Sequence, residues 1–100
     1  MVEEFELVEW EGFGWDEGNL LKNWEKHRVS ASECEQVFFN SPLISGLDEK
    51  HSRGEQRYYA LGATDTGKKL LIAFTVKGKL IRVISARDIS KNERKVFYEL

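Results

Sequence analysis

Three arginines in the carboxy-terminal half of the chain have the residue type and setting best suited to chemistry. Arg82 and Arg87 lie in an apolar stretch typical of a strand, and Arg57 opens an earlier strand-like stretch. Desolvating a guanidinium among Leu, Ile and Val is costly unless an anion meets it. A guanidinium also stays charged at any physiological pH and binds phosphate through two parallel hydrogen bonds. Two or three converging groups of this kind would suit a phosphodiester.

Strand alternation and nearby carboxylates leave the role of these arginines open. Residues five apart in a regular strand point to opposite faces, so Arg82 and Arg87 are expected on different sides of a sheet. At least one of them should then lie in a partly buried, electropositive pocket. Internal ion pairs explain the same residues equally well, and the sequence offers Arg57–Glu55, Arg87–Asp88 and Arg87–Glu93.

Candidates for moving protons are ambiguous. His51 lies in a polar loop shortly before Glu55, and His27 ends a predicted helix, whose dipole favours the protonated imidazole. A histidine at a helix end is more often a cap or surface residue than a catalyst, and His51 could be an exposed loop side chain. Lys22 and Lys26 could add contacts to an anion if the polar face of that helix borders the site. The aromatic residues that could stack on bases, or pack against the sheet, are Tyr58, Tyr59 and Tyr98.

The sequence gives little support for metal, cofactor or thiol chemistry. His27 and His51 are 24 positions apart, and Cys34 has no partner at ligand spacing, so neither a metal site nor a cofactor is expected. No glycine-rich phosphate loop, dinucleotide fingerprint or nucleophile elbow occurs. Cys34 lies on the apolar face of a predicted helix and is more typical of a core residue than of a nucleophile. A single cysteine agrees with a reducing cytoplasm.

The composition fits one small globular domain over residues 1–100. Of these 100 residues, 41% are hydrophobic and 32% charged, which suffices for one modest core and leaves too little chain for two domains. No charge-free run is long and apolar enough to span a membrane. Glu3 and Glu4 stand where a signal peptide would carry positive charge, so we expect a cytoplasmic protein.

Charge is distributed unevenly along the chain, although the net charge is only −2. Residues 1–49 carry 12 acidic and 3 basic side chains, and residues 50–100 carry 5 acidic and 12 basic ones. Such a split accompanies polyanion binding, or a basic face covered by an acidic partner. The alternative is a solvated surface on which the charges intermix once the chain folds.

Hydrophobic periodicity and capping signals predict an α+β fold with the order β-α-α-β-β-β-α. Asp16 can cap a helix over about 17–27, with Leu20, Leu21 and Trp24 as its apolar stripe. The remaining expected elements are a strand at 5–10, a second helix opening at the capping box Ser30–Glu33, a loop or poor strand over 43–54, strands at about 56–63, 69–76 and 80–87, and a terminal helix opening at the capping box Ser90–Glu93. Together they predict a small antiparallel sheet, made of a carboxy-terminal meander and an amino-terminal strand, with an αα-hairpin and a terminal helix. Val96, Phe97 and Leu100 should pack the terminal helix.

An ordered set of motifs resembles the BrnT-type toxins. The segments that match their opening motifs, F-x-W-D and N-x-x-K-H-G-V-S, are Phe13-Gly-Trp-Asp16 and Asn23-Trp-Glu-Lys-His27-Arg-Val-Ser30. Those similar to their G-E-x-R and R-x-I-S-A-R motifs are Gly54-Glu-Gln-Arg57 and Arg82-Val-Ile-Ser-Ala-Arg87, and Glu93-Arg94 and Tyr98 match the family's ending. The motifs run from about 13 to 99, and residues 1–12 form a possible extension before the family's customary start. Arg28 replaces the usual glycine, so that helix is expected to end without a left-handed residue.

This resemblance implies a bacterial ribonuclease toxin of a type II toxin–antitoxin pair, with a fold similar to RelE-type RNases. It also implies a BrnA-type antitoxin with a ribbon-helix-helix domain, so the toxin would meet DNA only through that partner, and no membrane. We expect a metal-independent endoribonuclease that inhibits translation, neutralised by an antitoxin covering the basic strand face. Combining residue chemistry with family position, we assign phosphate binding to Arg57, Arg82 and Arg87, the base to Glu55 or His51, a weaker acid candidate to His27, and RNA contacts to Lys22, Lys26, Arg94 and Tyr98. The alternative is a non-catalytic binding module that acts with its antitoxin in a DNA-binding repressor.

Overall fold

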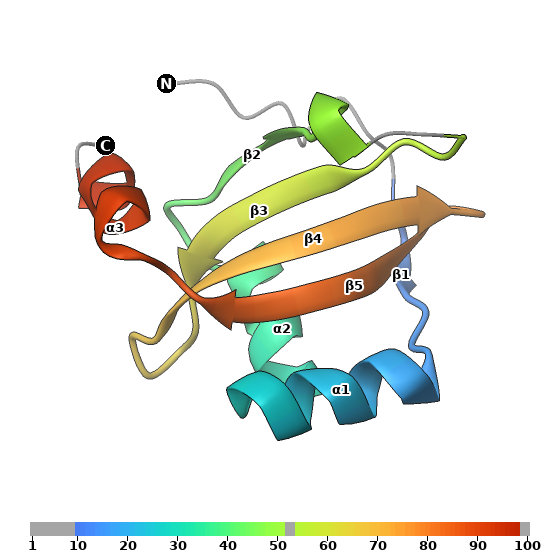
Figure 1. Ribbon diagram of the computed structural model, residues 1–100, viewed down its shortest axis with the longest axis horizontal. Coiled ribbons are helices and arrows are strands. Elements are labelled where there is room, and N and C mark those ends of the chain that lie inside the picture. The colour runs from blue at the N-terminus through green and yellow to red at the C-terminus, as the bar shows by residue number, and fades with distance from the viewer. Residues whose placement is uncertain (1–9, 52–53, 99–100) are drawn as a thin grey trace.

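Five strands form one mixed sheet in the spatial order β1-β5-β4-β3-β2, as Figure 1 shows. The computed structural model describes residues 10–51 and 54–98. Along the chain the elements are β1 (Gly12–Phe13), α1 (Glu17–His27), α2 (Ala31–Phe39), β2 (Ile44–Leu47), a 3-10 helix (Glu49–His51), β3 (Tyr58–Ala63), β4 (Lys69–Lys77), β5 (Leu80–Asp88) and α3 (Lys91–Tyr98). The predicted α+β class, helical hairpin, meander and terminal helix are confirmed.

The sheet is not the antiparallel one that we predicted, because β1 runs parallel to β5. Gly12 lies opposite Leu80, and Phe13 lies opposite Ile81. The Phe13 ring packs edge-on against Phe38 of α2, with centroids 5.6 Å apart, and this contact holds the short strand beside β5. Gly12 belongs to β1 and Gly14 directly follows it, so the two glycines beside Phe13 do not prevent this two-residue strand.

A fifth strand, β2, forms where the sequence predicted a loop or a poor strand. It pairs antiparallel with β3, and Gly46 lies opposite Tyr59. A Cβ atom on Gly46 would lie 2.9 Å from the Tyr59 hydroxyl oxygen, so only glycine leaves room for that side chain. The strand predicted at 5–10 falls outside the described residues, except for Trp10, which precedes β1.

The main core lies between α2 and one face of the sheet. Its buried side chains are Val29, Cys34, Val37, Phe38, Leu43, Ala60, Leu70, Ile72, Phe74, Ile81, Val83 and Ala86. The capping box at Ser30 and Glu33 is present and confirms the predicted start of α2. Burial raises the pKa of the Cys34 thiol to about 12, so Cys34 is a protonated core residue at neutral pH, as expected.

The bounds and the Asp16 cap of α1 are as predicted, but its predicted apolar stripe is wrong. Leu21 is 57% exposed and Trp24 is 45% exposed, whereas Asn23 is buried. The reason is the outer edge of β5, whose backbone groups need partners beyond the short β1. The Asn19 Nδ2 donates to the Val83 carbonyl at 3.3 Å, and the Ala86 N–H donates to Asn23 Oδ1 at 3.2 Å. The helix therefore turns its asparagines inward and its larger apolar residues outward.

Both ends of the helical framework show one further difference from the predictions. Arg28 itself adopts the left-handed conformation (φ 56°, ψ 40°), so a left-handed residue ends α1 after all. Its guanidinium lies over the Trp24 ring, 5.3 Å from the centroid, which offsets part of the strain. At α3, the capping box of Ser90 and Glu93 is confirmed, but Val96 is 52% exposed rather than packed. No helix within the described ranges is long and apolar enough to cross a bilayer.

Candidate functional site

One face of the sheet is left largely bare by the described helices. In Figure 1, α2 lies behind the sheet, α1 lies along β5, and α3 lies beyond one end of the strands. We call the uncovered side the open face. Cross-strand pairing arranges it in an apolar row of Ile44, Leu61, Leu71 and Arg87, and a tyrosine row of Gly46, Tyr59, Ala73 and Ser85. The apolar row is covered, because Ile89 packs against Leu61.

A β-bulge places two arginines on this face together. The register between β4 and β5 shifts so that Phe74 lies opposite Val83 and Ala73 lies opposite Ser85, which leaves Ile84 without a partner. The extra residue reverses the alternation beyond it. Arg82 and Arg87 therefore point to the same side of the sheet, and the expectation of opposite faces is wrong.

Arg57 and Arg82 lie in one cross-strand row at one end of the open face. Thr75 pairs with Arg82, and the register of β3 and β4 continued by one residue places Arg57 on the other side of Thr75. Adjacent strands lie about 5 Å apart, so the two Cα atoms are separated by about 10 Å. Arg57 is half-buried and Arg82 is exposed, while Thr75 between them is buried. These three residues form what we call the arginine row.

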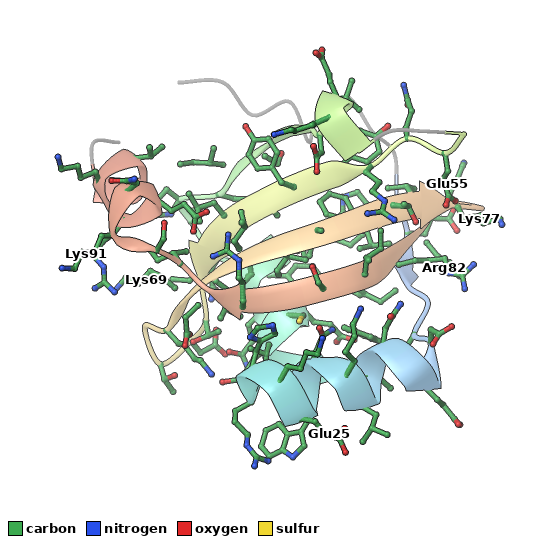
Figure 2. The ribbon with its side chains drawn as sticks, in the orientation of Figure 1. Glu25, Glu55, Lys69, Lys77, Arg82 and Lys91 are labelled. Atoms are coloured by element: carbon green, nitrogen blue, oxygen red, sulfur yellow. The ribbon has the colours of Figure 1, made fainter. Side chains whose placement is uncertain are left out.

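Further charged groups gather at the same end. Figure 2 shows Glu55, Lys77 and Arg82 close to the end of the sheet where β4 finishes and β5 begins. Arg82 is exposed, and it makes no hydrogen bond or ion pair with a described residue. Glu55 is exposed in the bend that precedes Arg57. General base catalysis on a phosphodiester needs a carboxylate or imidazole near groups that bind the phosphate.

Arg87 does not belong to this cluster. Its Nη1 and Nη2 donate to the two carboxylate oxygens of Glu93 at 2.9 and 2.8 Å, and Nη1 also donates to the Asp88 carbonyl at 3.0 Å. The bond raises the pKa of Arg87, and the Arg87 guanidinium lowers the pKa of Glu93 to about 2. Arg87 lies two rows from the arginine row, about 14 Å along the strand. The internal ion pair with Glu93 is the explanation that holds for Arg87. Arg57 and Arg82 are therefore the two predicted arginines that share the arginine row.

The proton-transfer candidates are also divided between the two ends. His51 ends the 3-10 helix, in the segment that leads to Glu55 and Arg57. His27 is exposed at the end of α1, which runs in the same direction as β5 because Asn19 meets Val83 and Asn23 meets Ala86. At 1.5 Å per residue it lies about 12 Å beyond Asn19, toward the Arg87 end. The structure thus places Glu55 near the arginine row and His27 away from it.

The predicted RNA contacts lie at the margin of the open face. The helical period puts Lys22 and Lys26 beside Asn19 and Asn23, on the face of α1 that borders β5. Lys22 is half-buried and Lys26 exposed. Arg94 is exposed on α3, at the Arg87 end, and the side chain of Tyr98 is outside the described part of the chain.

Several residues of the open face are not singled out by the sequence alone. Thr75 and Ser85 lie among the arginine and tyrosine rows, and Lys77 lies at the arginine end. The signal that could have found Thr75 and Ser85 is the cross-strand register, which depends on an unpredicted bulge. Among the residues that the structure describes, no group of three His, Cys, Asp or Glu side chains is placed to hold a metal ion.

Comparisons with known proteins identify one family. A family model described as the ribonuclease toxin BrnT of type II toxin–antitoxin systems matches residues 15–93. The crystal structure of the Brucella abortus ribonuclease toxin BrnT is similar with a TM-score of 0.58 and 20% sequence identity, covering 80% of this chain and 97% of that chain. At this identity the structural match shows a shared fold. No curated protein matches the chain significantly.

Proposed function

The chain belongs to the BrnT family of ribonuclease toxins of type II toxin–antitoxin systems, and from this membership we propose that it is a metal-independent endoribonuclease. The observation that carries the proposal is the arginine row, where Arg57 and Arg82 flank Thr75 on the open face. Two guanidinium groups that reach the same phosphodiester can hold its non-bridging oxygens. The predicted likeness to RelE-type RNases stays a prediction.

The proposed reaction uses a nucleophile that the RNA brings itself. A base removes the proton of a ribose 2′-hydroxyl, and this oxygen bonds to the adjacent phosphorus while the bond from phosphorus to the 5′-oxygen breaks. The products are a 2′,3′-cyclic phosphate and a 5′-hydroxyl, whose oxygen takes up one proton. The protein has to orient the in-line attack and stabilise the charge that develops on the phosphoryl oxygens.

The described residues divide these tasks unequally. Arg57 and Arg82 bind the phosphate and stabilise its charge, and Glu55 or His51 is the base because both precede Arg57 in the same segment. Lys22 and Lys26 can attract the flanking RNA backbone from the border of β5. His27 lies toward the Arg87 end, which weakens its claim to be the acid. Arg87 would join only after release from Glu93.

The partner of this toxin is proposed on the same grounds. We propose that a BrnA-type antitoxin with a ribbon-helix-helix domain covers the arginine row and blocks RNA access, so that the toxin meets DNA only through the complex. Cleavage of cytoplasmic RNA would then inhibit translation whenever the antitoxin is lost. Charge complementarity across such an interface favours fast association.

A cleavage assay tests the function directly. The purified chain is incubated with end-labelled RNA and EDTA, and we expect fragments ending in a cyclic phosphate. RNA with a 2′-deoxyribose at the cleaved position should remain intact, because the nucleophile is gone, and added antitoxin should stop the cleavage. The double variant Arg57→Ala/Arg82→Ala should be inactive.

Two outcomes would contradict the proposal. Cleavage that requires added metal, or that proceeds on the 2′-deoxy substrate, would exclude the mechanism. A well-folded chain that binds antitoxin tightly but leaves every RNA intact would instead support the non-catalytic repressor function.

A further inference from the structure

The tyrosine row lies directly beside the arginine row and is built unlike the rest of the sheet. Its four members are Gly46, Tyr59, Ala73 and Ser85, one from each of four neighbouring strands. Three of them have small side chains, so Tyr59 is the only large side chain in the row. Tyr59 follows Arg57 by two residues along the chain, so their Cα atoms are about 7 Å apart and their side chains leave the same face of the sheet.

The seat of the Tyr59 ring is specific. A Cβ atom on Gly46 would lie 3.1 Å from both Cε2 and Cζ of Tyr59 and 2.9 Å from its hydroxyl oxygen. The outer end of the ring therefore occupies the space that a side chain on β2 would fill. Tyr59 remains 36% exposed, and its hydroxyl makes no hydrogen bond within the described residues.

The neighbouring tyrosine has an ordinary structural role, which makes the contrast informative. Tyr58 points to the opposite face, where its ring stacks on Phe74 with centroids 5.5 Å apart, and its hydroxyl donates to Gln56. These two contacts account for the position of the Tyr58 side chain. Tyr59 instead lies on the open face beside Ala73, where part of its ring stays exposed and its hydroxyl has no hydrogen-bond partner among the described residues.

We infer that Tyr59 is the platform of a nucleobase subsite, an inference that rests on the proposed ribonuclease function. A base stacks on the exposed surface of the Tyr59 ring while the phosphate of a neighbouring nucleotide reaches Arg57 and Arg82. Stacking tolerates every base because each has a π-face. Ala73 leaves space beside the ring for the base and its ribose. The subsite thus positions RNA across the sheet without reading its sequence.

The test measures binding rather than cleavage. The probe is a fluorescent RNA oligonucleotide, 2′-deoxy at the cleaved position, together with a series in which one nucleotide at a time is abasic. For the wild type, one abasic position next to the cleaved bond should weaken binding about tenfold, since a stacked base contributes about 1–3 kcal/mol. Tyr59→Ala should weaken binding of the full oligonucleotide about tenfold and lose sensitivity to that abasic position.

Matched variants separate stacking from damage to the fold. Tyr59→Trp restores an aromatic surface and should recover both the affinity and the abasic sensitivity. Gly46→Ala should weaken binding with Tyr59 still present, because the new Cβ displaces the ring. Leu47→Ala is the control, since Leu47 is 37% exposed on the same edge strand but pairs with Tyr58 on the other side of the sheet. Circular dichroism confirms that each variant is folded.

The outcomes distinguish the subsite from the function. If Tyr59→Ala binds as tightly as the wild type while Arg57→Ala/Arg82→Ala loses binding, the platform is wrong and the phosphate site stands. If no abasic position in the series weakens binding to the wild-type protein, the platform is also wrong. If the wild type neither binds nor cleaves RNA, both the subsite and the proposed function are overturned.

Discussion

Arg82 and Arg87 belong to the same strand and point to the same face, yet their surroundings differ completely. Arg82 is exposed at the end where Glu55 and Lys77 lie, and it has no partner among the described residues. Arg87 donates from both terminal nitrogens, Nη1 and Nη2, to the Glu93 carboxylate. Glu93 is in reach because the capping box with Ser90 fixes the first turn of α3 just after β5. A guanidinium in a strand therefore becomes a ligand site or a structural pair according to whether the next element of the chain brings a carboxylate to it.

The largest test of this comparison is to remove each arginine separately. Arg82→Ala should slow single-turnover RNA cleavage about 100-fold or more, equivalent to about 3 kcal/mol of transition-state stabilisation, with little change in the melting temperature. Arg87→Ala should leave cleavage within a few-fold of wild type but lower the melting temperature, because it frees Glu93 and loosens the start of α3. If the two variants show the reverse pattern, the ion pair opens during catalysis and Arg87 is the phosphate ligand.

An intermediate effect is expected where α1 holds the bulged strand. Asn23→Ala removes the acceptor of the Ala86 N–H and leaves that buried donor unpaired, so the free energy of unfolding should fall by about 2 kcal/mol in urea denaturation. Asn19→Ala is the control and should cost less, because Asn19 is only partly buried and water can replace it at the Val83 carbonyl. Equal losses in the two variants would show that the buried Ala86 amide does not depend on Asn23 for its pairing.

The smallest effect concerns the charge state of Glu93. Its pKa is lowered in the folded protein to about 2, from an ordinary value of 4.5, by the hydrogen bonds from Arg87. The stabilisation is therefore fully present above about pH 4.5 and is lost as the pH falls toward 2. We expect the pair to contribute about 1 kcal/mol to the free energy of unfolding, because it is partly exposed and water screens it.

Chemical denaturation of the wild type and Glu93→Gln over this pH range measures that contribution. The two proteins should differ at pH 6 and converge near pH 2. The control is Glu25→Gln, since Glu25 lies on the side of α1 turned away from the sheet. A difference that persists at pH 2 would mean that Glu93 acts through packing rather than through its charge.

The sequence predicted those elements that depend on local chemistry. The caps at Asp16, Ser30 and Ser90 each need only a side-chain oxygen and a backbone amide a few residues apart, so their positions can be inferred from spacing. The strands of the meander are indicated by their β-branched and aromatic residues and by the turns that separate them at Gly67 and Gly78, both with positive φ. These elements carry Arg57 and Arg82 to the two strands that flank β4.

The failures concern interactions between distant segments. The inward face of α1 is set by unpaired backbone groups of β5, and no periodicity within the helix reveals that Asn23 rather than Trp24 is buried. The bulge at Ile84 decides which arginines share a face, and it depends on pairing with β4. Arg87 was given two explanations, and only the position of Glu93 in space selects one. The separation of His27 from Glu55 likewise depends on the direction in which α1 packs.

The asparagine contacts along β5 also affect how this molecule meets others. A strand at the border of a sheet offers unpaired amides and carbonyls to which strands of other molecules can add. Here Asn19 and Asn23 already occupy the Val83 carbonyl and the Ala86 amide, and β1 pairs with the start of the strand. A strand from another molecule cannot pair with these two groups. The helix α1 therefore protects this edge of the sheet against edge-to-edge aggregation, while the open face of the sheet stays uncovered by α1.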